Sequence, residues 1–526
     1  MIALPLAYAE IHYSPAVIPN ILRRKEPEIV LDVPHRVEPR QKLPILLLVK
    51  DAHRHPVRLL EVQVTLRVPG FPEIRQVFEL GPQTIDTPWY WQVLFLEPPA
   101  GAKGLAHVLP EIRVEVGESL RTYAADNYRR TSHSPFEVYL AEEGLPYPSG
   151  WFAGDLHTHS HLTADQVEFG SPWEPTIVLA RAAGLHWFAI TDHSYDLDDH
   201  PDDPLTHHRD FPKWRLLWAE LDRLQTELQD FVVLPGEELS VGNRRGRNVH
   251  LLIVGSRRFF AGDGDSAERW LRTKPQHLLP EVLDQVGEEP LVAAAHPGSP
   301  VPFLEWLLLR RGKWSLEDLS WTRLDGLQCL NGDFDASFDR ALALWVQLLV
   351  AGRRLGLLAG NDAHGNFGRF RQIGLPFVSM REGHRQLFGR AKTVVRLDGP
   401  PTREELLRQL RRARAVITDG PFVEIRGVKG DGSCLQAGEA ATERPRSLYV
   451  YAASTPEFGY VREIRLWLGR SSGETLYRIL RPNRLVYRFE TELPFPPHQD
   501  SGYVRASLFT RERGDHFALT NPIWFS

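Results

Sequence analysis

The chain has 526 residues, of which 42% are hydrophobic, and 62 basic residues against 67 acidic ones leave a formal net charge of −5. This length is enough for several hydrophobic cores, so we expect a globular protein with three or four domains. The near balance of charge excludes a generally polycationic surface of the kind that binds nucleic acid or anionic membranes.

The two cysteines, Cys329 and Cys434, are too few for a disulfide framework, and neither has the spacing of a zinc ribbon. No apolar run reaches the eighteen residues that a membrane span needs. Residues 1–9 are apolar but lack the basic residue that opens a secretion signal. We therefore expect a cytoplasmic protein without a membrane partner, for which nucleic acid is possible only as a substrate.

Residues 1–148 show short segments with the composition of β-strands, separated by Pro, Gly and Asp turn signals. The segments are residues 43–50, 62–68, 89–95, 112–116 and 136–140. This spacing predicts a β-sandwich domain, and residues 141–150, which are rich in Gly and Pro, form the joint to the next domain.

Residues 149–425 alternate between apolar runs and helical patterns. Apolar residues at three- and four-residue spacing predict helices at residues 174–183, 213–229, 278–287, 335–351 and 402–414. Strands that alternate with helices are typical of an α/β fold with a parallel sheet, in which the strand C-termini meet at one face. The Gly242–Gly246 turn departs from this pattern and predicts a local antiparallel hairpin that returns His250 beside Glu238.

Residues 304–321 form an insertion that contains Trp306, Trp314 and Trp321. We expect a helix that covers the central domain, while a lid or a dimer contact is the alternative. Residues 426–526 return to strand composition at 448–452, 463–468, 485–489 and 503–509, which predicts a second, C-terminal β-sandwich domain.

Metal-ligand residues follow the apolar runs of the central region. The motif GDLHTHS at residues 154–160 carries two histidines one residue apart, which project to the same side of a strand. Four more runs end in histidines or carboxylates, namely Asp192 and His193, Glu237 and Glu238, His296, and Asp362 and His364. Such residues at five strand ends predict a metal site at one face of this domain.

Six motifs resemble, in their order and spacing, those of the PHP superfamily, named for polymerase and histidinol phosphatase. They are DLHTHS at 155–160, ITDHS at 190–194, PGEELS at 235–240, HLLIVG at 250–255, AHP at 295–297 and GNDAH at 360–364. The resemblance implies a distorted seven-stranded (β/α) barrel, similar to a TIM barrel, that holds up to three metal ions. The flanking β-domains resemble those of the carbaryl-hydrolase-like branch.

The resemblance assigns nine metal ligands, His157, His159, Asp165, His193, Glu238, His250, His296, Asp362 and His364. In the family pattern His157, His159, Glu238 and Asp362 hold one ion; Glu238, His250 and His296 hold a second; and Asp165, His193 and His364 hold a third. Glu237 competes with Glu238 for the bridging position, and the Leu-Ser that follows Glu238 matches the family. Asp155 would either orient a ligating imidazole or accept a strand-end hydrogen bond.

Imidazoles and carboxylates without thiolates suit two or three divalent ions of Zn, Mn or Fe. Such ions lower the pKa of a bound water towards 7 and so provide a hydroxide nucleophile. We therefore expect a metal-dependent hydrolase in which Glu238 and Asp362 position the hydroxide, with phosphoesters as the leading substrate class. A carbamate, ester or amide hydrolase is the alternative, and an inactive, metal-stabilised binding scaffold is the third hypothesis.

Several basic side chains near the predicted site are candidates for contacts with the substrate. Arg244, Arg245 and Arg247 lie in the turn beside Glu238, where a guanidinium suits a phosphate or a carboxylate. An exposed basic turn accounts for them equally well. His161 lies close to the histidine pair and either contacts substrate or is solvated, and Arg369 and Arg371 leave the same two alternatives open.

Overall fold

The computed structural model describes residues 26–128, 131, 133–163, 169–200, 203–262, 264, 273–375, 379–441, 444–496, 501–511 and 516–525. The chain divides into two compact units. The first comprises Met1–Gly144, Ala164–Gly184 and Ala363–Phe388, and the second comprises Leu145–Thr163, Leu185–Asp362 and Gly389–Ser526. No helix in the described ranges is long and apolar enough to cross a membrane.

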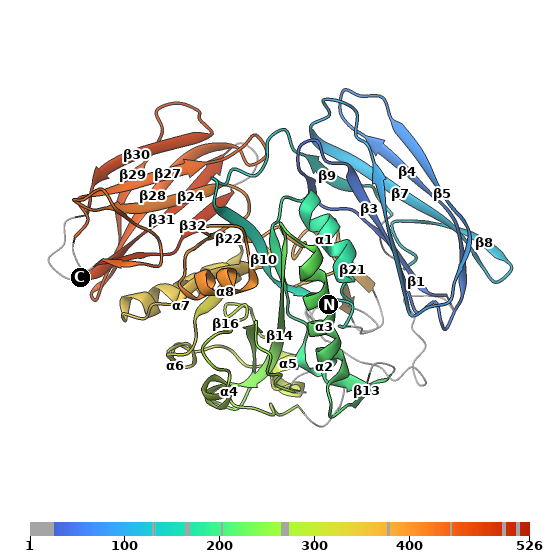
Figure 1. The fold of residues 1–526 in the computed structure, drawn as a ribbon, viewed down its shortest axis with the longest axis horizontal. Helices are drawn as coiled ribbons and strands as arrows, with labels where there is room; N and C mark the ends of the chain where they lie inside the picture. The colour runs from blue at the N-terminus through green and yellow to red at the C-terminus, as the bar shows by residue number, and fades with distance from the viewer. Residues whose placement is uncertain are drawn as a thin grey trace. The chain divides into compact units, whose positions relative to one another are not determined.

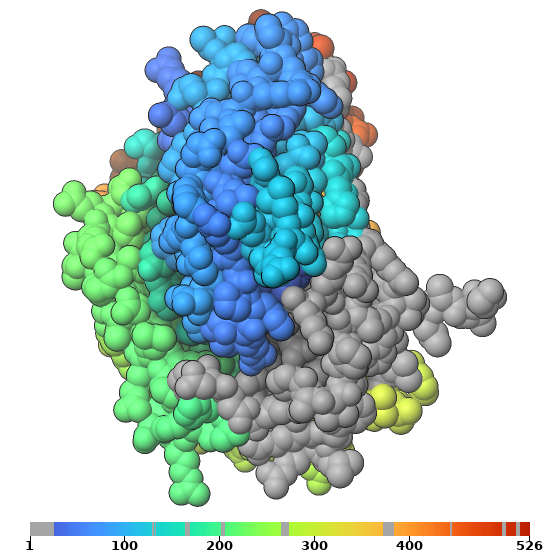
Figure 2. Space-filling model, turned by 90° about the vertical axis from the view of Figure 1, so that its right-hand side faces the viewer, coloured from blue at the N-terminus to red at the C-terminus, as the bar shows by residue number. Residues whose placement is uncertain are grey.

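Two sheets form the body of the first unit (Figure 1). One has the order β1–β3–β6, with β1 (Glu28–Asp32), β3 (Leu43–Lys50) and β6 (Trp89–Leu96). The other has the order β2–β9–β7–β4–β5, with β2 (Arg36–Val37), β9 (Phe136–Leu140), β7 (Gly104–Val116), β4 (Val57–Arg67) and β5 (Ile74–Ile85), and β8 (Ser119–Ala124) pairs with β7. In Figure 2 the atoms of these strands are coloured from blue to cyan.

Alternation of apolar residues explains how these sheets pack. In β4 the buried residues Val62, Val64 and Leu66 point to one face, because successive side chains of a strand point to opposite faces. They share one core with Ile45 and Leu47 of β3. The unit also contains α1 (Trp173–Ala182), β19 (Ala363–His364), β20 (Phe370–Leu375) and β21 (Ser379–Gly383).

One long, mixed sheet runs through the second unit in the order β18–β17–β16–β15–β14–β11–β10–β22–β23–β32–β31–β28–β29. Its first half consists of β18 (Gly356–Gly360), β17 (Gly326–Asn331), β16 (Leu291–Ala294), β15 (Asn248–Val254), β14 (Val232–Gly242), β11 (Trp187–Ile190) and β10 (Trp151–His159). Its second half consists of β22 (Lys392–Arg396), β23 (Ala415–Thr418), β32 (Phe517–Thr520), β31 (Gly502–Arg511), β28 (Tyr460–Arg470) and β29 (Gly473–Leu480).

The expected seven-stranded (β/α) barrel is wrong. Strands take up 44% of the described residues and helices only 15%, whereas a (β/α) barrel has a helix after every strand. β15 runs antiparallel to both of its neighbours, and the sheet continues through β22 and β23 into C-terminal strands. The error has a physical cause, because an apolar run has the same composition in a parallel and in an antiparallel sheet.

The helices lie close to the predicted positions. They are α3 (Pro212–Glu227), α4 (Leu279–Gln285), α7 (Ala336–Val350) and α8 (Arg403–Arg411) in this unit and α1 in the first. In α3 the buried Trp214, Leu217 and Leu221 recur every three or four residues. Asp335 caps the N-terminus of α7, and its side chain accepts hydrogen bonds from two backbone N–H groups of the first turn.

A four-stranded sheet of order β25–β24–β27–β30 completes the second unit. Its strands are β25 (Cys434–Leu435), β24 (Phe422–Val428), β27 (Ser447–Ala453) and β30 (Arg488–Pro494), while the short β26 (Ala440–Ala441) and β33 (Ile523–Phe525) pair with each other. β24 contacts β31 and β32 of the long sheet (Figure 1). The buried Trp345 of α7 shares a core with Leu327 of β17 and Leu519 of β32, which joins the central and C-terminal segments into one unit.

The insertion at 304–321 contains two short helices, α5 (Phe303–Leu308) and α6 (Leu316–Leu319). Trp314 is buried, whereas 42% of Trp306 is exposed. The insertion therefore covers part of the unit while it leaves an apolar surface in solvent.

Candidate metal centre

The ends of β10 and β18 lie unusually close together. The backbone N–H of Asp362 donates to the carbonyl of His157 at 2.8 Å. A Cβ at Gly360 would lie only 2.7 Å from the Cβ of His157, so the approach requires glycine at this position. As a result, residues separated by about two hundred positions in sequence meet at one point.

His157, His159, Glu238 and Asp362 offer ligand atoms that all lie within 4.8 Å of one another, and all four residues are buried. Nε2 of His159 lies 3.1 Å from Oδ1 of Asp362 and 3.3 Å from Nε2 of His157. Nε2 of His157 lies 3.2 Å from Oε2 of Glu238. This arrangement brings together the set expected for the first ion.

The second set meets at the other oxygen of Glu238. Oε1 lies 2.6 Å from Nδ1 of His250 and 3.0 Å from Nε2 of His296. The hairpin expected from the sequence is confirmed, because β14 and β15 pair antiparallel with Ser240 opposite His250. The two oxygens of Glu238 thus face two different histidine sets, which is the geometry of a bridging carboxylate.

The third set is described only in part. Nδ1 of His193 lies 3.0 Å from Oε2 of Glu238, so His193 joins the cluster. Asp165 lies outside the described residues, and His364 belongs to the first unit.

Two of the clustered residues have unusual backbone conformations. His296 has φ 29° and Asp362 has φ 54°, and each lies two residues beyond the end of a buried strand. Residues other than glycine rarely adopt positive φ, and when they do they are concentrated at functional sites. The strained backbone at His296 and Asp362 therefore positions their two side chains.

Two hydrogen bonds fix which nitrogen of the His157 ring faces the cluster. Nδ1 of His157 donates to Oε1 of Gln328 at 2.8 Å, and Nε2 of Gln328 donates to Asn331 at 3.1 Å, which sets the orientation of the amide. The lone pair of His157 is then on Nε2, which faces Glu238 and His159. Acceptors that face one another in a buried space need protons or a cation between them, so these residues fit a metal ion.

Burial and charge act in opposite directions on these groups. Burial alone would lower the pKa of His157, but the carboxylates of Glu238 and Asp362 outweigh it and raise the pKa to about 9. Burial would raise the pKa of Glu238 and of Asp362, but the nearby histidines hold both well below their usual range. The site therefore keeps its two carboxylates ionised, as ligands must be, whereas the His157 imidazole, which is protonated at neutral pH without an ion, must lose its Nε2 proton to bind one.

Glu237 and Asp155 lie beside the cluster but do not face it. Glu237 accepts hydrogen bonds from the hydroxyl of Ser194 at 2.7 Å and from the backbone of Phe260 at 3.2 Å, and burial raises its pKa to about 8. Asp155 accepts from the backbone of His157, Asn361 and Gly389, so it joins strand ends and contacts no imidazole nitrogen among the hydrogen bonds described.

The residues expected to bind substrate have other contacts. The guanidinium of Arg247 lies 4.3 Å from the ring centre of Trp306 and donates to its carbonyl, and that of Arg244 lies 5.5 Å from the ring centre of Trp321. Arg245 is exposed. Burial, assisted by Lys213, lowers the pKa of His161 to about 4. In the first unit Arg369 donates to Ser134 and Arg371 to Asp126.

Sequence reasoning missed two residues that contact the ligand histidines. The guanidinium of Arg311 contacts Nε2 of His250 and lies 3.7 Å from the buried Glu305, and Gln328 contacts His157. Gln328 lies inside the apolar strand β17, and a single amide side chain in such an apolar run could have indicated a residue of the site. Arg311 lies in the insertion, where no pattern distinguishes it.

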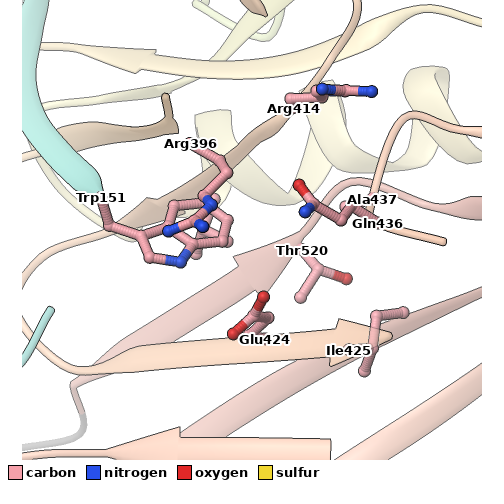
Figure 3. A pocket seen from close by; sticks show the side chains of 9 residues that line it. Trp151, Arg396, Arg414, Glu424, Ile425, Gln436, Ala437 and Thr520 are labelled. Carbon is pink, nitrogen blue, oxygen red and sulfur yellow. The ribbon is translucent and has the colours of Figure 1, made fainter. Parts of the chain in front are cut away.

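A separate small cavity lies in the second unit (Figure 3). Trp151, Arg396, Arg414 and Glu424 are among its lining residues, and its volume is about 10 Å³. A cavity of this size holds about one water molecule, so it is no substrate site.

Comparison with known proteins does not identify a family. No family model matches the chain, and no curated protein matches it. The structures that are similar include a β-glucuronidase from Parabacteroides merdae at 11% identity, with 95% of this chain and 65% of that chain covered and a TM-score of 0.18. A glycosyl hydrolase family 2 member from Bacteroides cellulosilyticus has 11% identity, 94% and 62% coverage and a TM-score of 0.15.

A β-D-mannosidase from Dictyoglomus thermophilum has 10% identity, coverage of 93% and 65% and a TM-score of 0.22. The chain spans less than two thirds of the length of these three proteins. TM-scores this low indicate neither a common fold nor a common activity.

Proposed function

We propose that the second unit is a metal-dependent hydrolase that acts on phosphoesters. The observation that carries this proposal is the position of Glu238, whose Oε2 lies 3.2 Å from Nε2 of His157 while its Oε1 lies 2.6 Å from Nδ1 of His250. A carboxylate between two sets of imidazoles suits a pair of adjacent cations. These residues lie in the sequence motifs that resemble those of the PHP superfamily, and membership of that superfamily is part of the proposal.

Each residue has a role that follows from its place. His157, His159 and Asp362 would hold one ion and His250 and His296 the other, with Glu238 shared between them. Divalent ions bound there supply Lewis acidity and a hydroxide nucleophile at neutral pH. Because the two carboxylates and His157 are almost fully buried, the cluster is shielded from bulk water and its electrostatic interactions are strong.

Arg311 supports a phosphoester over a neutral substrate. Its guanidinium lies against His250, at the side of the cluster formed by the second set of ligands. Arginine donates two parallel hydrogen bonds to phosphate oxygens, and such charge-assisted bonds are about twice as strong as neutral ones. A carbamate or an amide offers no such anion to the guanidinium.

The test combines elemental analysis with hydrolysis assays. Purified protein loaded with Mn²⁺ or Zn²⁺ is assayed with p-nitrophenyl phosphate, bis-p-nitrophenyl phosphate and aryl carbamates. We expect turnover of the phosphoesters, and loss of both metal and activity in Glu238→Gln and in Asp362→Asn. Glu317→Gln, at a side chain that is 76% exposed, is the matched control and should behave as the parent does.

Two results would contradict the proposal. Turnover of carbamates without turnover of phosphoesters would assign the site to the alternative class. Full activity in Glu238→Gln would show that Glu238 does not bridge two ions.

A further inference from the structure

A second group of ligand-type residues lies in the hairpin that follows His193. After α2 (Ser194–Leu197) the chain forms β12 (Asp199–His200) and β13 (Asp203–His207), which pair antiparallel with Asp199 opposite His207. Asp198, Asp199 and His207 offer ligand atoms that lie within 4.8 Å of one another. None of these three belongs to the cluster around Glu238.

The hairpin buries three carboxyl side chains close together. Asp196, Asp198 and Asp199 are each at most 1% exposed. Lys213 lies beside them, with Nζ 3.4 Å from Oδ2 of Asp199 and hydrogen-bonded to the carbonyl of Asp196 at 2.8 Å. Buried carboxylates are stable only beside charges, hydrogen-bond donors or metal ions.

Asp199 provides an independent sign that something is bound here. Lys213 faces its Oδ2, while its Oδ1 is fully buried and has no hydrogen-bond donor. A buried carboxylate oxygen without a donor is rare in folded proteins and calls for a bound ion or water.

We propose that Asp198, Asp199 and His207 form a second metal site, which holds one divalent transition-metal ion and is independent of the Glu238 cluster. An imidazole beside two carboxylates suits Zn²⁺ or Mn²⁺, whereas Ca²⁺ prefers oxygen ligands alone. The hairpin connects α2 to α3, and α2 and α3 are in contact (Figure 1). An ion here would hold in place the segment that begins at His193.

Metal counting in full-length variants tests this site. In Glu238→Gln/Asp362→Asn the main cluster is disabled, and the protein is stripped with EDTA, dialysed against Zn²⁺ or Mn²⁺ and analysed by mass spectrometry for metal per chain. Addition of Asp199→Asn should lower the content by one ion per chain. Asp210→Asn, at an exposed position of the same loop, should leave it unchanged.

Thermal unfolding gives a second readout that needs no activity. Zn²⁺ or Mn²⁺ should raise the unfolding midpoint of the doubly substituted protein, and Asp199→Asn should abolish that shift. His207→Gln should have the same effect, so it decides the question if Asp199→Asn does not fold. Equal metal content with and without Asp199→Asn and His207→Gln would overturn the site, whether or not the protein hydrolyses any ester.

Discussion

Gln328 accepts a hydrogen bond from Nδ1 of His157 at 2.8 Å, and this contact decides which ring nitrogen of His157 faces Glu238. The same amide oxygen lies 3.4 Å from the backbone nitrogen of His296. One side chain in the middle of β17 therefore contacts a residue from each of the two ligand sets.

Substitution Gln328→Met should weaken metal binding by about 10–100-fold, because partners that fix a ligating imidazole contribute this much to metal affinity. The side chains have similar volumes, so the core should remain packed. The dissociation constant is measured by competition with a chromophoric chelator. Gln347→Met, at an exposed position of α7, is the control, and equal affinities in the two variants would show that Gln328 does not orient His157.

Glu237 should behave differently from its neighbour Glu238. Its folded-state pKa of about 8 lies above the ordinary value of 4.5, so between these pH values the folded chain binds a proton that the unfolded chain has lost. The free energy of unfolding must then fall as pH rises from about 4.5 through about 8. Glu237→Gln keeps the shape without the titration, and above pH 8 it should be more stable than the parent by up to a few kcal/mol.

This difference is measured by urea unfolding of the metal-free proteins at pH 6 and pH 9. Metal content of Glu237→Gln should equal that of the parent, because the side chain bonds to Ser194 and Phe260 instead of facing the cluster. Loss of metal in this variant would show that Glu237, and not Glu238, is the bridging ligand.

The sequence was sufficient for local features of the fold. Helix α3 follows from Trp214, Leu217 and Leu221 at helical spacing, and the β14–β15 hairpin follows from the turn at Gly246, whose φ is 64°. Both depend on residues close together in the chain. The meeting of His157 with Glu238 and Asp362 also followed from sequence, because each comes at the end of an apolar run.

Long-range features could not be predicted from these patterns. The apolar run of β15 does not reveal that it also pairs antiparallel with β16, since both of its faces are buried in either arrangement. Arg311 and His250 are 61 residues apart in the sequence, and no periodic pattern of residues indicates that they are in contact. The inclusion of residues 363–388 in the first unit was likewise not visible in composition.

Arg311 should affect substrate more than metal. If its guanidinium binds a phosphate oxygen, Arg311→Gln should lower kcat/KM for phosphomonoesters by about 10–100-fold, the effect of one lost hydrogen bond to a charged group. Arg247→Gln removes a guanidinium that lies over Trp306 and should change kcat/KM little. Steady-state kinetics and metal content are measured together, and a loss of metal in Arg311→Gln with an unchanged KM would show that Arg311 only supports His250.

Gly360 is a position at which a single methyl group should damage the site. A Cβ there would lie 2.7 Å from the Cβ and 2.8 Å from the backbone nitrogen of His157, and backbone atoms cannot yield as a flexible side chain can. Gly360→Ala should push apart β18 and β10, lower the free energy of unfolding by about 1–3 kcal/mol and reduce metal content, because Asp362 moves with β18.

Gly399→Ala, where a Cβ would meet nothing within 4 Å, is the matched control and should change the stability by no more than about 1 kcal/mol. Urea unfolding and metal analysis measure both variants, and equal stability and equal metal content would mean that the two strand ends do not need this close approach.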